Sequence, residues 1–237
     1  MDGDGSIQVN HWRKKYLQYR LIIKLSNLKS NEKMLKLIQK RFKGHVRTTT
    51  NGEFVLWALD DKIDIINAIK VFDKYPPLTS RLTCCLSFLK TCLSHNDVET
   101  YLATRDNKYF NQSKIIQDNM NKFDLSNLGY FNSWLSGFIE SEGCFSIRKD
   151  EKNKSFSIGQ NNDIYIINLI KSYFGASNTI RLITPLPSAK NKNQDKKFYS
   201  IEIYKNTTLL KIINHCETYP LLGAKKDNFL KFKKSFK

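Results

Sequence analysis

The sequence predicts an α+β fold that contains two pseudo-twofold αββαββα repeats, each built around one antiparallel sheet. Two observations support this prediction. The 237-residue chain runs twice through the same order of alternating apolar segments and helix-period segments. The two copies differ in length where loops are expected, most of all in the Lys- and Pro-rich stretch 184–197. We therefore expect a first repeat over residues 1–92, a helical linker over 93–130 and a second repeat over 131–237.

The first repeat shows period-two alternation in its strand candidates and apolar residues three or four apart in its helix candidates. Its helices are followed by a glycine or by a Tyr-Pro pair, which end helices. A basic, helix-like segment then begins at Arg81. The expected elements are strands over 7–10 and 19–25, a helix over 34–42, strands over 46–50 and 54–59, and a helix over 63–72.

The second repeat follows the same order, and its own Tyr-Pro pair again precedes a basic segment, which begins at Lys225. It differs in opening with a complete apolar helix before its first strand. The expected elements are a helix ending at Gly143, strands over 145–148 and 155–160, a helix over 164–174, strands over 179–183 and 198–203, and a helix over 209–216, with linker helices over 98–109 and 113–121.

The charge of the chain indicates the class of partner. It carries 39 Lys and Arg residues against 22 Asp and Glu residues, a formal net charge of +17. Self-repulsion destabilises such a chain unless a polyanion shares its surface, so nucleic acid is the first expected partner and an anionic membrane the second. No stretch of ~18 apolar residues is present, so no membrane-spanning helix is expected. The five cysteines contain no C-x-x-C pair, which disfavours a structural zinc site.

An acid-x-acid-Gly pattern occurs twice, at residues 2–5 and 140–143. The second copy ends an apolar helix, whose carboxyl end already carries partial negative charge, so acids there are disfavoured by ~0.3–1 kcal/mol each. A pattern that twice places acids unfavourably indicates that a cation binds there. If two such helices pack side by side, Asp4 and Glu142 meet, and hard oxygen ligands near a phosphate favour Mg²⁺.

The stretch 135–143, LSGFIESEG, resembles the LAGLIDADG motif of homing endonucleases and intron maturases, and MDGDG at 1–5 resembles the second half of a first copy. The resemblance covers nearly the whole chain and is strongest to double-motif proteins encoded in fungal mitochondrial group I introns. It therefore implies a product of the mitochondrial genome that acts in that organelle. It also implies that Asp4 and Glu142 bind the divalent metal, while Asp2 and Glu140 shape helix ends.

The resemblance implies further catalytic residues. A basic residue after each Tyr-Pro pair is expected near the scissile phosphate, and the matching positions are Arg81 and Lys225. Gln160 matches a polar residue that positions water, whereas Leu25 occupies the equivalent place in the first repeat. The implied mechanism is Mg²⁺-assisted hydrolysis of two phosphodiester bonds, one in each DNA strand, without a covalent nucleophile.

The resemblance also implies that each sheet forms half of a DNA-binding saddle lying in the major groove. Because side chains alternate along a strand, one polar set faces the base edges while the apolar set packs under helices. The candidates for base contacts are Gln8, Asn10, Arg20, Ile22, Lys24, Ser146, Arg148, Ser157 and Gly159, and those for phosphate contacts are Arg13, Lys14, Lys15, Lys190, Lys192, Lys196 and Lys197.

Three functions fit this chain. The first is a site-specific DNA endonuclease, acting as a monomer, that promotes intron mobility. The second is a maturase that binds its host group I intron RNA and assists splicing. The third is a binder of nucleic acid without sequence preference. The sequence holds only the second half of the first motif, so we expect the missing half-helix to be encoded upstream of Met1, or cleavage to have been lost.

Overall fold

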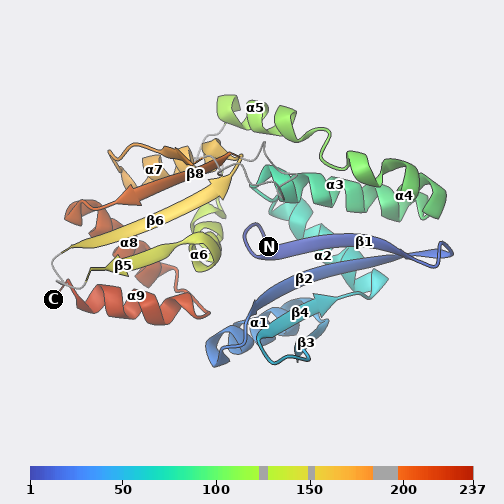
Figure 1. The fold of residues 1–237 in the computed structure, drawn as a ribbon, viewed down its shortest axis with the longest axis horizontal. Helices are drawn as coiled ribbons and strands as arrows, with labels where there is room; N and C mark the ends of the chain where they lie inside the picture. Colours follow the sequence, from blue (N-terminus) through green and yellow to red (C-terminus); the bar gives the residue numbers. More distant parts are fainter. Residues whose placement is uncertain (123–127, 149–152, 184–196, 237) are drawn as a thin grey trace, which may run out of the picture. The chain divides into compact units, whose positions relative to one another are not determined.

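The computed structural model describes residues 1–122, 128–148, 153–183 and 197–236, and the chain divides into two compact units, Met1–Ile115 and Ile116–Lys237 (Figure 1). Each unit contains one four-stranded antiparallel sheet with helices packed against it. The predicted α+β class and the repeated architecture are therefore confirmed. None of the described helices is both long enough and apolar enough to cross a membrane.

The sheet of the first unit has the strand order β1-β2-β4-β3. Its strands are β1 (Gly5–Trp12), β2 (Tyr16–Ser26), β3 (His45–Thr48) and β4 (Phe54–Leu59). Burial alternates along β2, where Leu17, Tyr19 and Leu21 are buried while Gln18 and Arg20 are exposed. This alternation gives the sheet one apolar face and one open polar face.

Helices α1 (Lys29–Phe42), α2 (Lys62–Lys74) and α3 (Ser80–His95) complete the core of the first unit. Helix α1 packs on β4 and α2 on β2, and α3 runs along β1 (Figure 1). Each helix contributes a fully buried leucine or isoleucine, namely Leu35, Ile65 and Leu82. Residues 2–4 form a turn before β1, where the resemblance implies the end of a helix.

The segment after α3 consists of α4 (Val98–Thr104), the 3-10 turn η1 (Arg105–Asn107) and α5 (Gln112–Lys122). The helix predicted over 98–109 is therefore too long. Helix α4 ends at Thr104, where the 3-10 turn η1 begins. From there the backbone makes tighter bonds between residues three apart, such as that from the Phe110 N–H to the Asn107 carbonyl. The Tyr101 hydroxyl donates to the Val9 carbonyl (3.0 Å) and so pairs part of the otherwise open edge of β1.

The second unit repeats this arrangement with the strand order β5-β6-β8-β7. Its predicted αββαββα order is confirmed, and one further helix follows. The elements are α6 (Phe131–Glu142), β5 (Cys144–Ile147), β6 (Lys154–Asn161), α7 (Ile164–Phe174), β7 (Arg181–Ile183), β8 (Phe198–Ile203), α8 (Asn206–Thr218) and α9 (Lys225–Lys234). Helix α6, which carries the second motif, packs with one face against β6, α8 and α9.

A buried histidine joins three elements in the core of the second unit. His215 is only 4% exposed, and its Nε2 lies 3.2 Å from the Ser136 hydroxyl while its Nδ1 lies 3.0 Å from the Tyr173 hydroxyl. Because Ser136 donates to the Tyr219 carbonyl (2.7 Å), its oxygen accepts from His215 Nε2–H, and Tyr173 donates to Nδ1. The imidazole is therefore neutral, and burial lowers its pKa to about 4.

Acid is expected to destabilise the second unit through His215. Its folded pKa lies below the unfolded value of about 6.5, so the stabilisation is complete above pH ~6.5 and decreases as the pH falls to about 4. The loss amounts to about 3 kcal/mol in the free energy of unfolding, measured by urea denaturation at several pH values. His215→Gln removes this dependence, and the exposed His95→Gln serves as the control. Parallel pH profiles for wild type and His215→Gln would contradict the prediction.

Candidate functional site

Both acid-x-acid-Gly segments pass directly into the first strand of their unit. Gly5 begins β1, and Gly143 immediately precedes β5. A Cβ atom on Gly5 would lie 2.6 Å from the Met1 carbonyl oxygen, and one on Gly143 would lie 2.7 Å from that of Ile139. These approaches are too close for any larger residue, so the glycine of each pattern lets the strand turn sharply away.

The first acid of the first motif binds Thr79, the N-cap residue of α3. Asp2 is 9% exposed, and its Oδ1 accepts from the Thr79 backbone N–H (2.9 Å) and from the Thr79 hydroxyl (2.6 Å). The Leu78 N–H approaches the other carboxylate oxygen at 3.4 Å. These groups lie at the start of α3, where backbone N–H groups lack helical partners and a negative charge is favourable.

The first acid of the second motif does the same for α9. Glu140 Oε2 accepts from the backbone N–H groups of Leu222 (3.1 Å) and Gly223 (3.0 Å), and its Oε1 accepts from that of Lys225 (2.9 Å). Leu222 and Gly223 follow their Tyr-Pro pair at the same distance as Leu78 and Thr79. Asp2 and Glu140 were expected to shape the ends of the motif helices, whereas in the structure each accepts hydrogen bonds at the start of a distant helix of its own unit.

The second acid of each motif has a different environment. Asp4 is exposed in the turn before β1, and Glu142 is half-buried at the last position of α6. Among the described residues, no group of three or more His, Cys, Asp or Glu side chains is placed to hold a metal ion. One carboxylate from each motif, completed by water and substrate phosphate, is the oxygen donor set that Mg²⁺ accepts. The meeting of Asp4 and Glu142 stays a prediction, because they belong to different units.

The two predicted basic residues occupy equivalent places with different contacts. Arg81 Nη2 donates to the backbone carbonyls of Asp2 (3.3 Å), Gly3 (3.2 Å) and Gly5 (3.1 Å). The arginine thereby holds the first motif turn against α3. Lys225 is the first residue of α9, and its side chain is half-buried. Each cation thus lies at the amino end of the helix that its motif acid caps.

Gln160 lies near the end of β6 and is 8% exposed. Its Oε1 accepts from the neighbouring Asn161 backbone N–H at 3.2 Å. The strand registers pair Asn161 with Phe198 and Ser26 with Phe54, each at the start of the next paired strand. This makes Leu25 the structural equivalent of Gln160. The predicted role of Gln160 in positioning water stays a prediction.

The open face of the first sheet carries the predicted base-contact residues of that unit. Gln8 pairs with Arg20 across β1 and β2, and Asn10 lies further along β1 on the same face. The Arg20 guanidinium lies 3.2 Å from the Asp60 carboxylate, and Lys24 Nζ lies 4.0 Å from the Phe54 ring centroid. These contacts hold the long side chains above the sheet, where polar and cationic groups suit the major groove.

The hairpin turn between β1 and β2 holds two basic residues in a strained conformation. Arg13 and Lys14 have φ values of +48° and +55°, and the Lys15 N–H donates to the Trp12 carbonyl (2.8 Å). A turn with positive φ at both central residues favours Asn-Gly, and other residues there cost about 1–2 kcal/mol each. The sequence therefore keeps two cations at an exposed tip at the expense of stability.

Relieving this strain is expected to stabilise the protein and weaken binding to DNA. Arg13→Asn with Lys14→Gly should raise the free energy of unfolding by about 1–2 kcal/mol. The same change should remove up to about two phosphate contacts, which lowers the slope of log K for duplex binding against log salt by up to about 2. Arg13→Ala with Lys14→Ala is the control, because it removes the charges without relieving the backbone. Unchanged affinity in both double variants would exclude the tip from the interface.

The open face of the second sheet differs from the prediction at one position. A Cβ atom on Gly159 would lie 2.4 Å from the Phe198 ring, so this aromatic side chain covers the strand there. Arg148 and Lys197 are exposed at the ends of β-strands, as an interface requires.

The predicted phosphate contacts Lys190, Lys192 and Lys196 lie outside the described residues, and Lys14 and Lys15 lie in the hairpin turn of the first unit.

The predicted site residues did not include Arg181 and Glu202, which lie on this sheet. Arg181 Nη1 lies 3.8 Å from Glu202 Oε2, and the Ser155 hydroxyl donates to Glu202 Oε1 (3.0 Å). Hydrogen bonds from Tyr204 and Ser155 lower the pKa of the Glu202 carboxyl, so it is ionised at neutral pH. Arg181 lies in the strand predicted over 179–183, but β7 has three residues, too few for alternation to show which face of the sheet carries Arg181.

Comparison with known proteins adds to this geometry. The family model described as LAGLIDADG endonuclease matches residues 1–92 and 135–236. A probable intron-encoded endonuclease aI3 of Debaryomyces hansenii is 44% identical over 267 residues, covering 99% of this chain and 36% of that protein. Its namesake in Dictyostelium citrinum is 40% identical over 240 residues, covering 100% and 92%. The chain thus spans about a third of the first relative and nearly all of the second.

Solved structures share the fold at low identity. The LAGLIDADG homing endonuclease I-GzeII, in complex with its DNA target, is 20% identical with a TM-score of 0.69, covering 98% of this chain and 86% of that one. I-SmaMI, bound to uncleaved DNA in the presence of calcium ions, is 17% identical with a TM-score of 0.68 and the same coverage. These similarities concern the fold alone.

Proposed function

Because the chain belongs to the LAGLIDADG endonuclease family, we propose that it is an intron-encoded, site-specific DNA endonuclease that makes a metal-dependent double-strand break. The duplicated motif carries this proposal. In each unit the first acid, Asp2 or Glu140, accepts hydrogen bonds at the start of a helix. The second acid, Asp4 or Glu142, lies at the end of the motif segment. Such a break at an intronless site promotes intron homing.

In this proposal Asp4 and Glu142 hold the divalent cation, for which Mg²⁺ fits the oxygen donors. When bound, the metal activates water and neutralises the charge that develops on the leaving oxygen. Arg81 and Lys225 supply positive charge beside the scissile phosphates. Gln160 orients the attacking water.

The open sheet faces bind duplex DNA, with one unit for each half of the site. The covalent link between two units makes the chain act as a monomer. The name of one relative, an uncharacterized cox1 intron-2 protein of Schizosaccharomyces pombe that is 28% identical over 116 residues, supports encoding in the mitochondrial genome. The mitochondrion is therefore the proposed place of action.

The relatives from Debaryomyces hansenii and Dictyostelium citrinum are described as probable endonucleases, which favours cleavage over the maturase alternative. The test incubates the chain with Mg²⁺ and DNA spanning the intron insertion site of the intronless allele. We expect a double-strand break that EDTA abolishes and that the intron-containing allele does not undergo. Intact DNA together with accelerated splicing of the host intron RNA would replace the nuclease by a maturase. Equal affinity for unrelated duplexes would indicate a non-specific binder.

A further inference from the structure

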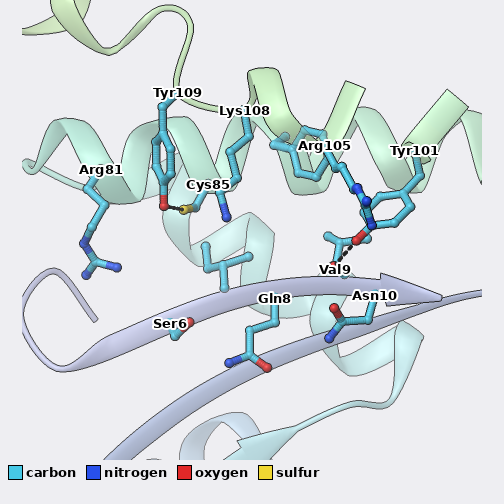
Figure 2. A pocket seen from close by; sticks show the side chains of 12 residues that line it. Ser6, Gln8, Val9, Asn10, Arg81, Cys85, Tyr101, Arg105, Lys108 and Tyr109 are labelled. Carbon is cyan, nitrogen blue, oxygen red and sulfur yellow. Dashed lines mark hydrogen bonds between the residues drawn. The ribbon is translucent and has the colours of Figure 1, made fainter. Parts of the chain in front are cut away.

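A pocket of about 450 Å³ lies entirely within the unit Met1–Ile115, between β1 and the segment that follows α3 (Figure 2). Its strand side carries the polar residues Ser6, Gln8 and Asn10. Its helix side is formed by residues of α3, α4 and η1 and by the turn after η1. No function was expected of this linker segment, yet it builds half of a pocket beside the predicted DNA-binding face.

Three cations from separate parts of the backbone line the pocket. Arg81 comes from α3, Arg105 from η1, and Lys108 from the turn that follows. Figure 2 shows Arg81 and Lys108 extending from the helix side toward β1. The Arg105 Nε lies 3.8 Å from the Asp106 carboxylate, but both side chains are well exposed, so this pair offsets little of the positive charge. Like charges gathered around one cavity are stabilised when an anion binds between them.

Two tyrosines hold the linker cations in position. The Tyr101 hydroxyl bonds the Val9 carbonyl of β1, and the Tyr109 hydroxyl lies 3.5 Å from the Cys85 sulfur of α3 (Figure 2). Lys108 Nζ lies 4.9 Å from the Tyr109 ring centroid, a cation–π contact that directs the ammonium group. Because Arg105 and Lys108 lie between these two anchors, less conformational entropy is lost when they bind a ligand.

We propose that this pocket binds a phosphate of the nucleic-acid backbone and thereby extends the DNA interface from the sheet to the linker. The inference rests on the proposed function, because it takes duplex DNA as the ligand. Gln8 and Asn10 contribute both to the pocket and to the open sheet face. A duplex read by these two side chains therefore brings its backbone beside Arg105 and Lys108, whose N–H groups form charge-assisted hydrogen bonds with phosphate oxygens.

The test compares two double variants that both lower the formal net charge from +17 to +15. Arg105→Gln with Lys108→Gln removes the linker cations and leaves Arg81 in place. Lys33→Gln with Lys40→Gln is the matched control, because both lysines are exposed on α1. The dissociation constant for labelled target duplex is measured by fluorescence anisotropy from about 50 to about 300 mM KCl, and thermal melting verifies that each variant is folded.

We expect the linker variant to lower the slope of log K against log salt by about 1–2 and to weaken binding about 5- to 30-fold, since each phosphate contact contributes about 0.9 to the slope. The control should stay within about twofold of wild type. Equal slopes for the two double variants would overturn the proposal. A second result would also overturn the proposal. If calorimetry shows that binding of inorganic pyrophosphate depends on Arg105 and Lys108 while duplex binding does not, the ligand of the pocket is a free phosphate compound.

The two proposals fail in different ways. If wild type cleaves its target and the linker variant keeps the wild-type slope, the phosphate pocket is wrong and the nuclease assignment stands. If wild type binds no duplex at any salt concentration, the nuclease assignment is wrong and the pocket proposal fails with it.

Discussion

Replacing Asp4 by Asn, or Glu142 by Gln, is expected to slow DNA cleavage by about 10²–10³-fold, because about 3–4 kcal/mol of metal-supplied transition-state stabilisation is lost. Each change removes one anionic oxygen ligand with little change in side-chain shape. The open sheet faces are untouched, so the dissociation constant for the target duplex should change less than about threefold. Single-turnover cleavage at saturating protein, together with anisotropy measurements of binding, separates the two effects.

Asp227→Asn provides the matched control for this pair. Asp227 is an exposed acid in the first turn of α9, and its replacement changes the net charge by the same amount. We expect wild-type cleavage from it. Full activity of Asp4→Asn would remove Asp4 from the metal site, and the same result for Glu142→Gln would remove Glu142.

Local patterns in the sequence predict most of the fold. Strand β2 and the first part of β1 alternate between a more buried and a more open face, and α7 carries apolar residues at helical spacing. These signals depend on residues a few positions apart. The repeated order then supplies the topology, because two copies of one pattern fold in the same way.

Features that depend on distant residues were harder to predict. Asp2 contacts residues more than 70 positions away, and Glu140 contacts residues more than 80 positions away. Nothing in the local spacing tells an acid that binds a helix start from the acid two residues later that is proposed to bind the metal. The pocket beside β1 was missed for the same reason, since Arg105 and Lys108 reach it only after the linker folds back onto α3.

The largest expected effect on stability comes from replacing the first acid of each motif, Asp2 or Glu140. Asp2→Ala should lower the free energy of unfolding by about 2–6 kcal/mol, because Thr79 is fully buried and its backbone N–H and its hydroxyl both lose their acceptor, at about 1–3 kcal/mol each. Glu140→Ala should have a similar effect on the second unit, where α9 has no other side-chain cap at Ala224. Asp2→Asn and Glu140→Gln keep one acceptor oxygen and should cost about half as much.

Urea denaturation of the full chain measures these changes, and Asp4→Ala and Glu142→Ala serve as controls two residues away. The control changes should alter stability by less than about 1 kcal/mol, since Glu142 lies at the carboxyl end of α6, where the helix dipole disfavours an acid, and Asp4 is exposed in the turn before β1. Unfolding midpoints equal to wild type for Asp2→Ala and Glu140→Ala would show that the capping bonds contribute nothing. If the expected order holds, the first acid of each motif stabilises the start of the helix that carries Arg81 or Lys225, and the second acid, the proposed metal ligand, contributes less to the stability of the fold.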